Sequence, residues 1–206
     1  MREIMMPALR ASLVTFVLSG LLYPLTLTGL GQLLMPFQAN GSLDRSPDGT
    51  VIGSQLIGQY WSGPEWFHGR LSVTTNTDPN DPAKTVPAPY NAASSNASNL
   101  GPTSKELERR LSADRKSLEK MQPELAGKKL PTDMLTASGS GLDPDITPAN
   151  ARLQVARVAK GRGVPQHEIQ ALVDQHTRGR SLGIFGEPHV NVLALNLALL
   201  STNPAR

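Results

Sequence analysis

The sequence predicts one N-terminal transmembrane helix followed by a single α+β extracytoplasmic domain. The first observation behind this prediction is that the segment from Ala11 to Leu43 contains no Asp, Glu, Lys or Arg. The second is that residues 36–206 combine β-prone runs and turn signals with helix-type apolar spacing. The third is their length, which is sufficient for one domain with its own hydrophobic core.

The composition excludes several classes of protein. The 206 residues include no cysteine, which excludes a disulfide scaffold, a thiolate metal site and a cysteine nucleophile. The formal net charge is only +3, from 20 Lys and Arg residues against 17 Asp and Glu residues. Since so small a charge on this length does not indicate nucleic-acid binding, we expect no nucleic-acid partner.

The predicted transmembrane helix comprises residues 11–35. A stretch of about 20 apolar residues spans a bilayer, so this segment is long enough to cross with some tilt, with the lipid bilayer as its partner. Pro24 lies inside it and is expected to kink the helix, which membrane helices tolerate. A cleaved signal peptide would have a shorter apolar run and a small-x-small cleavage site, and no A-x-A pattern follows Met35.

Basic residues on either side of this helix predict its orientation. Arg2, Arg10 and the amino terminus precede the helix, whereas only Arg45 follows it closely. By the positive-inside rule, residues 1–10 are then cytoplasmic and residues 36–206 lie outside the cytoplasm.

One face of the predicted helix carries small side chains. Ala11, Thr15 and Ser19 recur every four residues, so they share a face on which another helix can approach closely. The alternative is that such residues are common in any membrane helix. Both interpretations stand on the sequence alone.

The part after the membrane helix is predicted to begin with a β-hairpin over residues 40–60. Its turn is SPDG at Ser46–Gly49, because Asp-Gly between β-prone runs favours a tight turn. Residues 61–70 concentrate aromatic side chains, which suit the core, the bilayer interface or a partner contact. Residues 72–102 have few large apolar side chains and are rich in Asn, Thr, Ser and Pro, so we expect a long polar loop there.

Helices are predicted in the second half of the chain. A capping box at Thr103–Glu106, with the threonine as N-cap, predicts the start of a heavily charged helix. Thr147–Pro148 supplies the N-cap and first residue of the next helix, which Gly161 and Gly163 should end. Pro165 opens a further helix. The last apolar segment, VNVLALNLALL, is predicted as a short buried helix, although its spacing also allows a strand.

The one catalytic pattern that the sequence suggests is a serine hydrolase using Ser138 or Ser140. The nucleophile elbow requires G-x-S-x-G between a strand and a helix, but Ser138 occupies the first glycine position. A loop whose hydroxyls cap nearby backbone, with Asp143 and Asp145 in the same role, is favoured. The four histidines lack ligand spacing, and His176 is expected in the core. No catalytic residue, metal site or cofactor site is therefore predicted.

Six segments, in a fixed order over nearly the whole chain, carry a specific resemblance. They are GQLLMPFQANGSL (Gly31–Leu43), GSQLIGQYW (Gly53–Trp61), FHGR (Phe67–Arg70), SNLGPTS (Ser98–Ser104), TASGSGLDPDITP (Thr136–Pro148) and GEPHVNVLALNLAL (Gly186–Leu199). Together they resemble the C subunit, KdpC, of the Kdp-type potassium-transporting P-type ATPases. Leu71 stands where that family usually has proline, and residues 72–89 are longer than its typical linker. These departures affect only local loops.

The resemblance implies a place in a bacterial inner-membrane complex. Its expected partners are a potassium-binding channel-like subunit, a P-type ATPase subunit and a very small membrane subunit. The chain would be single-pass, with a periplasmic domain over residues 36–206. ATP, Mg and K⁺ are used by the complex, and no cofactor is expected on this chain.

The resemblance also implies a non-catalytic role in assembly, as a catalytic chaperone that raises the ATP affinity of the ATPase subunit. The chain has neither a Walker motif nor the D-K-T-G motif of aspartyl-phosphate formation, so phosphoryl transfer is not its own. Because ATP is cytoplasmic and most of this chain is expected in the periplasm, the effect on ATP affinity would be indirect. The alternative function is an independent, membrane-anchored periplasmic serine hydrolase.

Two loops are candidates for partner contact. One contains Asn99 and Gly101, and the other runs from Ser138 through Ser140 to Asp143 and Asp145. Glycine-rich turns serve equally well to define a fold, so partner contact and fold definition remain alternatives.

Overall fold

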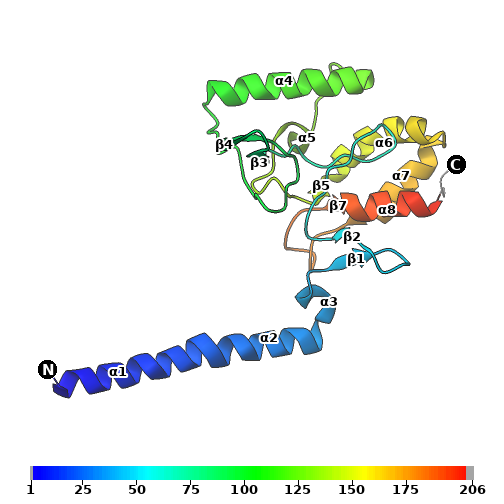
Figure 1. The fold of residues 1–206 in the computed structure, drawn as a ribbon. Coiled ribbons are helices and arrows are strands. Elements are labelled where there is room, and N and C mark those ends of the chain that lie inside the picture. The colour runs from blue at the N-terminus through cyan, green and yellow to red at the C-terminus, as the bar shows by residue number, and fades with distance from the viewer. Residues whose placement is uncertain (1, 203–206) are drawn as a thin grey trace. The chain divides into compact units, whose positions relative to one another are not determined.

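The computed structural model describes residues 2–202, which begin with one long helical run. It consists of α1 (Arg2–Phe16), the π-helical segment η1 (Val17–Leu22) and α2 (Tyr23–Leu34) (Figure 1). Ile4–Leu34 has a mean hydropathy of 1.7 and none of it is buried, so by length and composition this helix can cross a membrane. The helix thus begins earlier than the predicted residue 11 and ends one residue before Met35.

The structure accommodates Pro24 with a wider helical turn. The π-helical segment ends just before this proline, and the Tyr23 N–H donates to Leu18 O, five residues back. Pro24 has no N–H to continue an α-helical ladder, so the predicted disturbance takes the form of π-helical turns.

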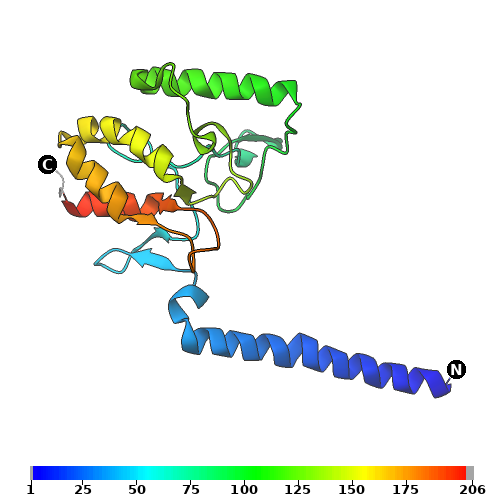
Figure 2. The same ribbon diagram turned by 180° about the vertical axis from the view of Figure 1, so that it is seen from behind.

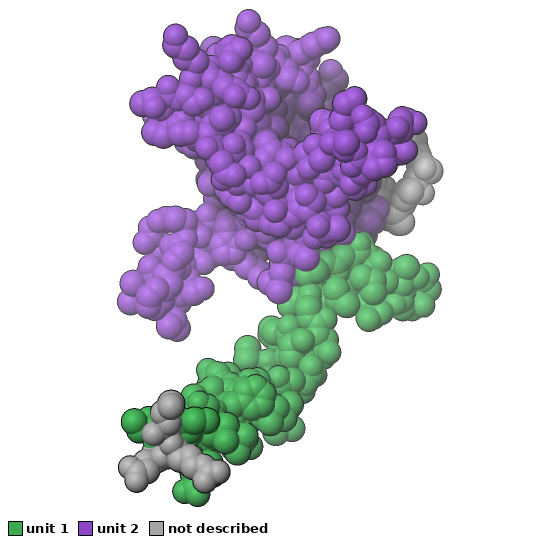
Figure 3. Space-filling view, turned by 60° about the vertical axis from the view of Figure 1, so that its left-hand side comes forward, with its two compact units in different colours: residues 1–54 green, residues 55–206 purple. Residues whose placement is uncertain are grey.

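The chain divides into two compact units, residues 1–54 and residues 55–206 (Figure 3). The first unit contains the long helix, the short helix α3 (Pro36–Ala39) and the hairpin of β1 (Leu43–Arg45) and β2 (Val51–Ser54). The boundary between the two units falls after this hairpin, so the hairpin and the long helix belong to the same compact unit.

The predicted first hairpin is confirmed. β1 and β2 pair antiparallel, with Leu43 opposite Ser54. The turn is closed by the Gly49 N–H donating to Ser46 O at 2.8 Å, and Gly49 has a φ of +85°. Glycine adopts this left-handed conformation without steric cost, which explains the Asp-Gly signal.

The expected long loop over residues 72–102 is only partly a loop. It contains an antiparallel hairpin of β3 (Thr75–Asp78) and β4 (Asp81–Pro87). These strands are mostly exposed and lack alternating apolar residues, so the sequence had no strand signal there. The buried Thr74 ties the hairpin down, since its hydroxyl donates to Ala88 O at 2.6 Å.

The charged helix α4 (Lys105–Met121) begins one residue later than the predicted capping box implies. Ser104, not Thr103, is the N-cap, and its Oγ accepts from the Leu107 N–H at 3.4 Å. Two adjacent hydroxyl residues offered two registers, and the backbone of Ser104 has the extended conformation that an N-cap requires. α4 contains no fully buried residue, so its charged surface is solvated.

A small hydrophobic cluster lies between α4 and the following segments. Its buried members are Leu125, Leu130 and Met134, and Leu118 of α4 packs against them. Leu125 belongs to the 3₁₀ turn η2 (Pro123–Leu125), and Met134 belongs to the short helix α5 (Thr132–Leu135).

The main core lies between a small sheet and three helices (Figures 1 and 2). The elements, in chain order, are β5 (Asp145–Ile146), α6 (Pro148–Arg162), α7 (Gln166–Gln175), β6 (Thr177–Arg178), β7 (His189–Asn191) and α8 (Val192–Thr202). The sheet has the order β5-β7-β6, with both pairings antiparallel. Phe67 is fully buried in this core, which places part of the aromatic cluster 61–70 inside the molecule.

The predicted ends of these helices can be compared with the observed ends one by one. Thr147 is the N-cap of α6 and accepts from the Asn150 N–H at 3.1 Å, as predicted. Gly163, with a φ of +67°, ends α6, but Gly161 lies inside that helix. Gly161 is there because a Cβ would meet the backbone of Pro64 at 2.8 Å. The last apolar segment is first strand β7 and then helix α8, so both alternatives for it are present in succession.

Candidate functional site

The segment 63–70, which contains the FHGR motif, is held by polar side chains on the inner face of α6. Arg157 is buried, and its Nη1 donates to the carbonyl oxygens of Gly63, Pro64 and Trp66 at 3.2, 2.9 and 2.9 Å. Burial lowers the pKa of Arg157 to about 10, which still leaves it protonated at neutral pH. A single buried cation therefore supplies the hydrogen bonds of three backbone carbonyl groups in this segment.

Gln154 and Asn196 pair with the backbone in the same way. Gln154 Oε1 accepts from the His68 N–H at 2.8 Å and its Nε2 donates to His68 O at 3.0 Å. Asn196 of α8 accepts from the Phe67 N–H at 2.9 Å and donates to Phe67 O at 3.0 Å. Each side-chain amide imitates a neighbouring strand, so the segment is fixed on both sides without belonging to a sheet.

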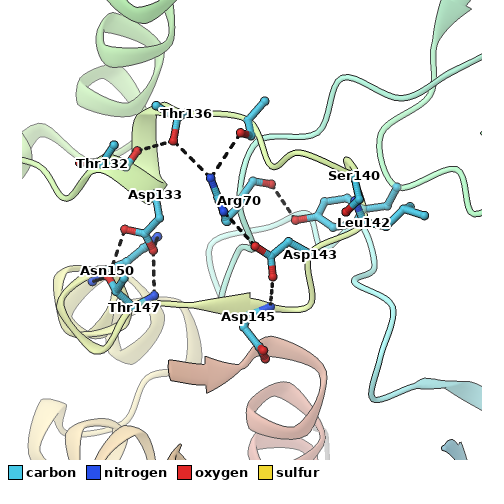
Figure 4. Close-up of polar contacts among 12 residues, drawn as sticks. Arg70, Thr132, Asp133, Thr136, Ser140, Leu142, Asp143, Asp145, Thr147 and Asn150 are labelled. Carbon is cyan, nitrogen blue, oxygen red and sulfur yellow. Dashed lines mark hydrogen bonds and ion pairs between the residues drawn. The ribbon is translucent and has the colours of Figure 1, made fainter. Parts of the chain in front are cut away.

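A second group of contacts joins Arg70 to the glycine-rich loop (Figure 4). Its Nη1 forms an ion pair with Asp143 Oδ2 at 2.9 Å, and its Nη2 donates to Thr136 Oγ1 and Ala137 O, both at 3.3 Å. Asp143 Oδ1 in turn accepts from the Asp145 N–H at 3.1 Å. The charge pair thus locks FHGR against the TASGSGLDPD segment.

Asp133 organises the start of α6 (Figure 4). Its carboxylate accepts from the Thr147 N–H at 2.8 Å, from Thr147 Oγ1 at 3.1 Å and from Asn150 Nδ2 at 3.0 Å. The carboxylate lies beside the N-terminus of α6, where the helix dipole favours negative charge.

Tyr90 closes the same region from the polar segment before α4. Its hydroxyl donates to Arg70 O at 2.7 Å, and burial raises its pKa. The ring leaves no space for a side chain at Gly58, where a Cβ would meet its Cε1 at 2.5 Å, and an even closer contact excludes one at Gly69. Glycine is therefore required at both positions by close approach, not by turn conformation.

Asp145, His189 and Asn191 lie together on the small sheet. Asn191 Nδ2 donates to Asp145 Oδ1 at 3.1 Å and to Gln55 O at 3.0 Å, and its Oδ1 accepts from the Ala194 N–H at 3.0 Å. Burial raises the pKa of Asp145, although His189 Nε2 lies 4.0 Å from its carboxylate. Asn191 thereby joins the first residue of the second unit to the start of α8.

A cavity of about 510 Å³ opens between α4, the segment 60–71 and α6. Its walls include Trp61, Met121 and the charged Asp114 and Arg157. Burial raises the pKa of Asp114, which has Arg110 as its ion-pair partner. Within residues 2–202 no group of three or more His, Asp or Glu side chains is placed to hold a metal ion.

The serine-hydrolase alternative is not supported by the positions of its serines. Ser138 is buried and its Oγ has no hydrogen-bond partner among the described residues, while Ser140 Oγ accepts from the Leu142 N–H at 3.1 Å. His68 Nε2, His176 Nδ1 and His189 Nδ1 lie against backbone carbonyl oxygens, and His189 Nε2 lies 4.0 Å from Asp145 Oδ2. A nucleophile with an adjacent base is therefore not assembled here.

The remaining sequence-predicted residues are not brought together with this network. Asn99, with a φ of +52°, and Gly101 are exposed before α4. Ala11, Thr15 and Ser19 line one shallow groove on the long helix. His176 was expected in the core, but it is half-buried at the C-cap of α7, where its Nδ1 lies 2.9 Å from Leu172 O.

Sequence reasoning missed the buried polar residues that hold the network. Asn150, Gln154, Arg157, Asn191 and Asn196 are all buried, and none of them was assigned a role on the sequence alone. A signal was present in their spacing, because Asn150, Gln154 and Arg157 recur at helical intervals beside the apolar Ala151, Val155 and Val158. Buried polar residues need partners, so such a row indicates a backbone segment lying against the helix.

Residues 5–201 match the family model described as KdpC: K⁺-transporting ATPase, c chain. The chain is 52% identical to the potassium-transporting ATPase KdpC subunit of Methylobacterium nodulans over 193 residues, 94% of each chain. It is 54% identical to that of a Bradyrhizobium species over 94% of each chain, and 53% identical to that of Bradyrhizobium diazoefficiens over 97% of this chain and 96% of the relative.

Proposed function

Because the chain belongs to the KdpC family of K⁺-transporting ATPase c chains, we propose that it is a non-catalytic accessory subunit of a high-affinity, ATP-driven potassium-uptake pump. The observation that carries the proposal is the end-to-end similarity, at 52–54% identity over at least 94% of both chains, to relatives named as subunits of that ATPase.

The proposed location is the bacterial inner membrane, with a single span. Support comes from Ile4–Leu34, the one helix among the described residues that is long and apolar enough to cross a membrane. Arg2 and Arg10 near its beginning favour a cytoplasmic N-terminus, which would place the second unit in the periplasm.

The proposed partners are the channel-like potassium-binding subunit, the P-type ATPase subunit and a very small membrane subunit. Ala11, Thr15 and Ser19 are the proposed packing face, because they line one groove together with Ser12, Phe16 and Gly20. Small side chains let helix backbones approach and let hydroxyls bond across the contact. The exposed Asn99 and Gly101 remain candidates for a contact outside the membrane.

We further propose that the chain raises the ATP affinity of the ATPase subunit without touching nucleotide. The proposed topology separates the second unit from cytoplasmic ATP. A subunit that binds one conformation of the ATPase more tightly shifts the population toward it, and the affinity for ATP changes by the same coupling free energy.

The test of the main proposal is affinity purification of the full chain, tagged at its C-terminus, from membranes in mild detergent. We expect large polytopic partners in the eluate, identified by mass spectrometry, together with potassium-stimulated ATPase activity. The matched control is the same tagged chain from cells that lack the other pump subunits. A chain that elutes alone from membranes containing those subunits would contradict the proposal.

The chaperone role needs a separate measurement. We expect the complex without this chain to show a higher KM for ATP than the intact complex, with the chain itself remaining unlabelled by a photoreactive ATP analogue. Labelling within residues 36–206 would show direct nucleotide contact and overturn the indirect mechanism.

A further inference from the structure

The loop between β6 and β7 carries the two most exposed large apolar side chains that the structure describes in the second unit, Leu182 and Ile184, together with the exposed Phe185. Leu182 is 88% exposed, Ile184 71% and Phe185 64%. In both ribbon views this loop extends away from α6 and α7 (Figures 1 and 2). Such a group of exposed apolar side chains on a soluble surface indicates a contact with something else. We call residues 181–186 the apolar tip.

The backbone of the apolar tip forms a tight turn that is bonded across its base. The Ser181 N–H donates to Phe185 O and the Phe185 N–H to Ser181 O, both at 2.9 Å. The Gly183 N–H donates to Arg180 O at 3.1 Å and the Ile184 N–H to Ser181 O at 3.2 Å. These bonds hold Leu182, Ile184 and Phe185 together on one turn.

Charge is confined to the base of the tip. Between Arg180 and Glu187 no residue is ionisable, and these two form an ion pair with both carboxylate oxygens 2.7 Å from Arg180 Nη2. Arg178 and His189 face each other one step further down the ribbon. An uncharged apolar end above a polar base matches the apolar and headgroup layers of a membrane surface.

The ribbon that carries the tip begins where the chain enters the second unit. Asn191 of β7 donates to the carbonyl of Gln55, the first residue of that unit. Leu56 and Ile57, which follow, are also exposed, at 63% and 38%. Residues 35–54 join this point to the end of α2, so the reach of these 20 residues limits how far the ribbon can lie from the bilayer that α1 and α2 are proposed to cross.

We propose that the apolar tip inserts Leu182, Ile184 and Phe185 into the interfacial layer of the phospholipid bilayer, as a second membrane contact of this chain. The proposal rests on the proposed function, because it requires that Ile4–Leu34 anchors the chain in the membrane. The exposed apolar side chains, the absence of charge at the tip and the short connection to α2 together favour lipid.

The experiment uses the absence of cysteine from the chain. Ile184→Cys in the full-length chain is labelled with a polarity-sensitive fluorophore and reconstituted into nanodiscs of phosphatidylethanolamine and phosphatidylglycerol. Doxyl-labelled lipids then report contact by quenching. Ser112→Cys on the exposed surface of α4 is the control outside the membrane, and Leu21→Cys in the long helix is the control for anchorage.

We expect quenching at Ile184→Cys to exceed that at Ser112→Cys by about threefold or more, and to fall when Leu182 and Phe185 are both replaced by serine. Equal quenching at the tip and at Ser112→Cys overturns the inference. A blue-shifted but unquenched tip also overturns it, because the tip then contacts protein. If Leu21→Cys is unquenched as well, anchorage itself fails; if only the tip is unquenched, the proposed function survives and this inference does not.

Discussion

Several buried polar side chains in the second unit hydrogen-bond to backbone N–H and C=O groups, as a neighbouring strand would do. Arg157 is the clearest case, since among the described residues it forms no ion pair and instead donates to three carbonyl oxygens and to Gln154 Oε1. Removing one partner of such a buried set leaves polar groups without water or protein to bond. The family motif FHGR is therefore explained by what lies against it, not by chemistry of its own.

His68 is expected to make the stability of the second unit depend on pH. Burial and the nearby Arg157 cation lower its pKa below the ordinary value of 6.5. Below pH 6.5 the unfolded chain therefore binds a proton at this histidine that the folded chain does not bind. The contribution of His68 to the free energy of unfolding is fully present above pH 6.5 and is lost as the pH falls below it. The contribution has a slope of at most about 1.4 kcal/mol per pH unit.

This dependence is measured by thermal unfolding from pH 5 to pH 8, followed by the fluorescence of Trp61 and Trp66, both in the second unit. His68→Gln should flatten the acid side of the profile, because glutamine can still donate to Gly63 O. The exposed His167→Gln is the control and should leave the profile unchanged. If the two variants behave alike, His68 does not carry the effect.

Asn196 is expected to be essential to the core. Asn196→Leu keeps the volume but leaves the N–H and C=O of the buried Phe67 without their partners at 2.9 and 3.0 Å. Each unsatisfied group costs about 1–3 kcal/mol, so we expect a loss of about 3 kcal/mol in the free energy of unfolding. Ser201→Ala on the same helix is exposed and should change it by less than about 0.5 kcal/mol. A small loss for Asn196→Leu in denaturant titration would show that the backbone of Phe67 finds other partners.

At the scale of elements, replacing the hydroxyl N-caps of α6 and α4 is expected to lower the free energy of unfolding by unequal amounts. Thr147 accepts from the Asn150 N–H at 3.1 Å and also donates to Asp133, whereas Ser104 accepts from the Leu107 N–H at 3.4 Å and begins a helix without buried residues. Thr147→Ala should cost about 1–2 kcal/mol and Ser104→Ala no more than about 0.5 kcal/mol. Chemical denaturation of the matched pair measures both. Equal losses would mean that α4 is as firmly docked as α6.

The elements also show which signals were sufficient in the sequence. α6 and α7 were predicted because their caps and apolar spacing are local and agree with each other. β3 and β4 were missed because Thr, Asn and Pro give no alternation, and their pairing depends on distant contacts such as Thr74 with Ala88. The register of α4 was wrong because Thr103 and Ser104 are chemically equivalent until the backbone conformation is known.

The candidate site was predictable only in outline for the same reason. The segments FHGR and TASGSGLDPD were recognisable by resemblance, and the loop interpretation of Ser140 and Asp143 agrees with their hydrogen bonds. That Arg70 pairs with Asp143, 73 residues away, follows from the fold and from no local pattern. Close approaches such as Tyr90 against Gly58 and Gly69 are equally non-local.

At the scale of the whole molecule, the chain is a proposed membrane anchor joined to a second unit. The buried polar side chains of that unit hold its loops in place. The first unit has almost no buried side chains, because Ile4–Leu34 is entirely exposed without a membrane or partner. A helix of this kind is stable only when lipid or other helices cover it. Assembly with other subunits is therefore expected to depend on which face of the helix is offered to them.

The helix face that carries Ala11, Thr15 and Ser19 is expected to control assembly with the other subunits. Thr15→Leu and Ser19→Leu should fill the groove that these residues line with Ala11, and so keep a partner helix at a distance. Leu13→Phe adds comparable bulk away from that groove and serves as the control. We expect recovery of the pump subunits with the tagged chain to fall about fivefold for the first two variants, equivalent to about 1 kcal/mol, and to be unchanged for the control. Quantitative mass spectrometry of the eluates, normalised to the amount of tagged chain in the membrane, measures this. A comparable loss with Leu13→Phe would mean that the helix tolerates no added bulk on any face, and normal recovery of all three would assign assembly to the second unit alone.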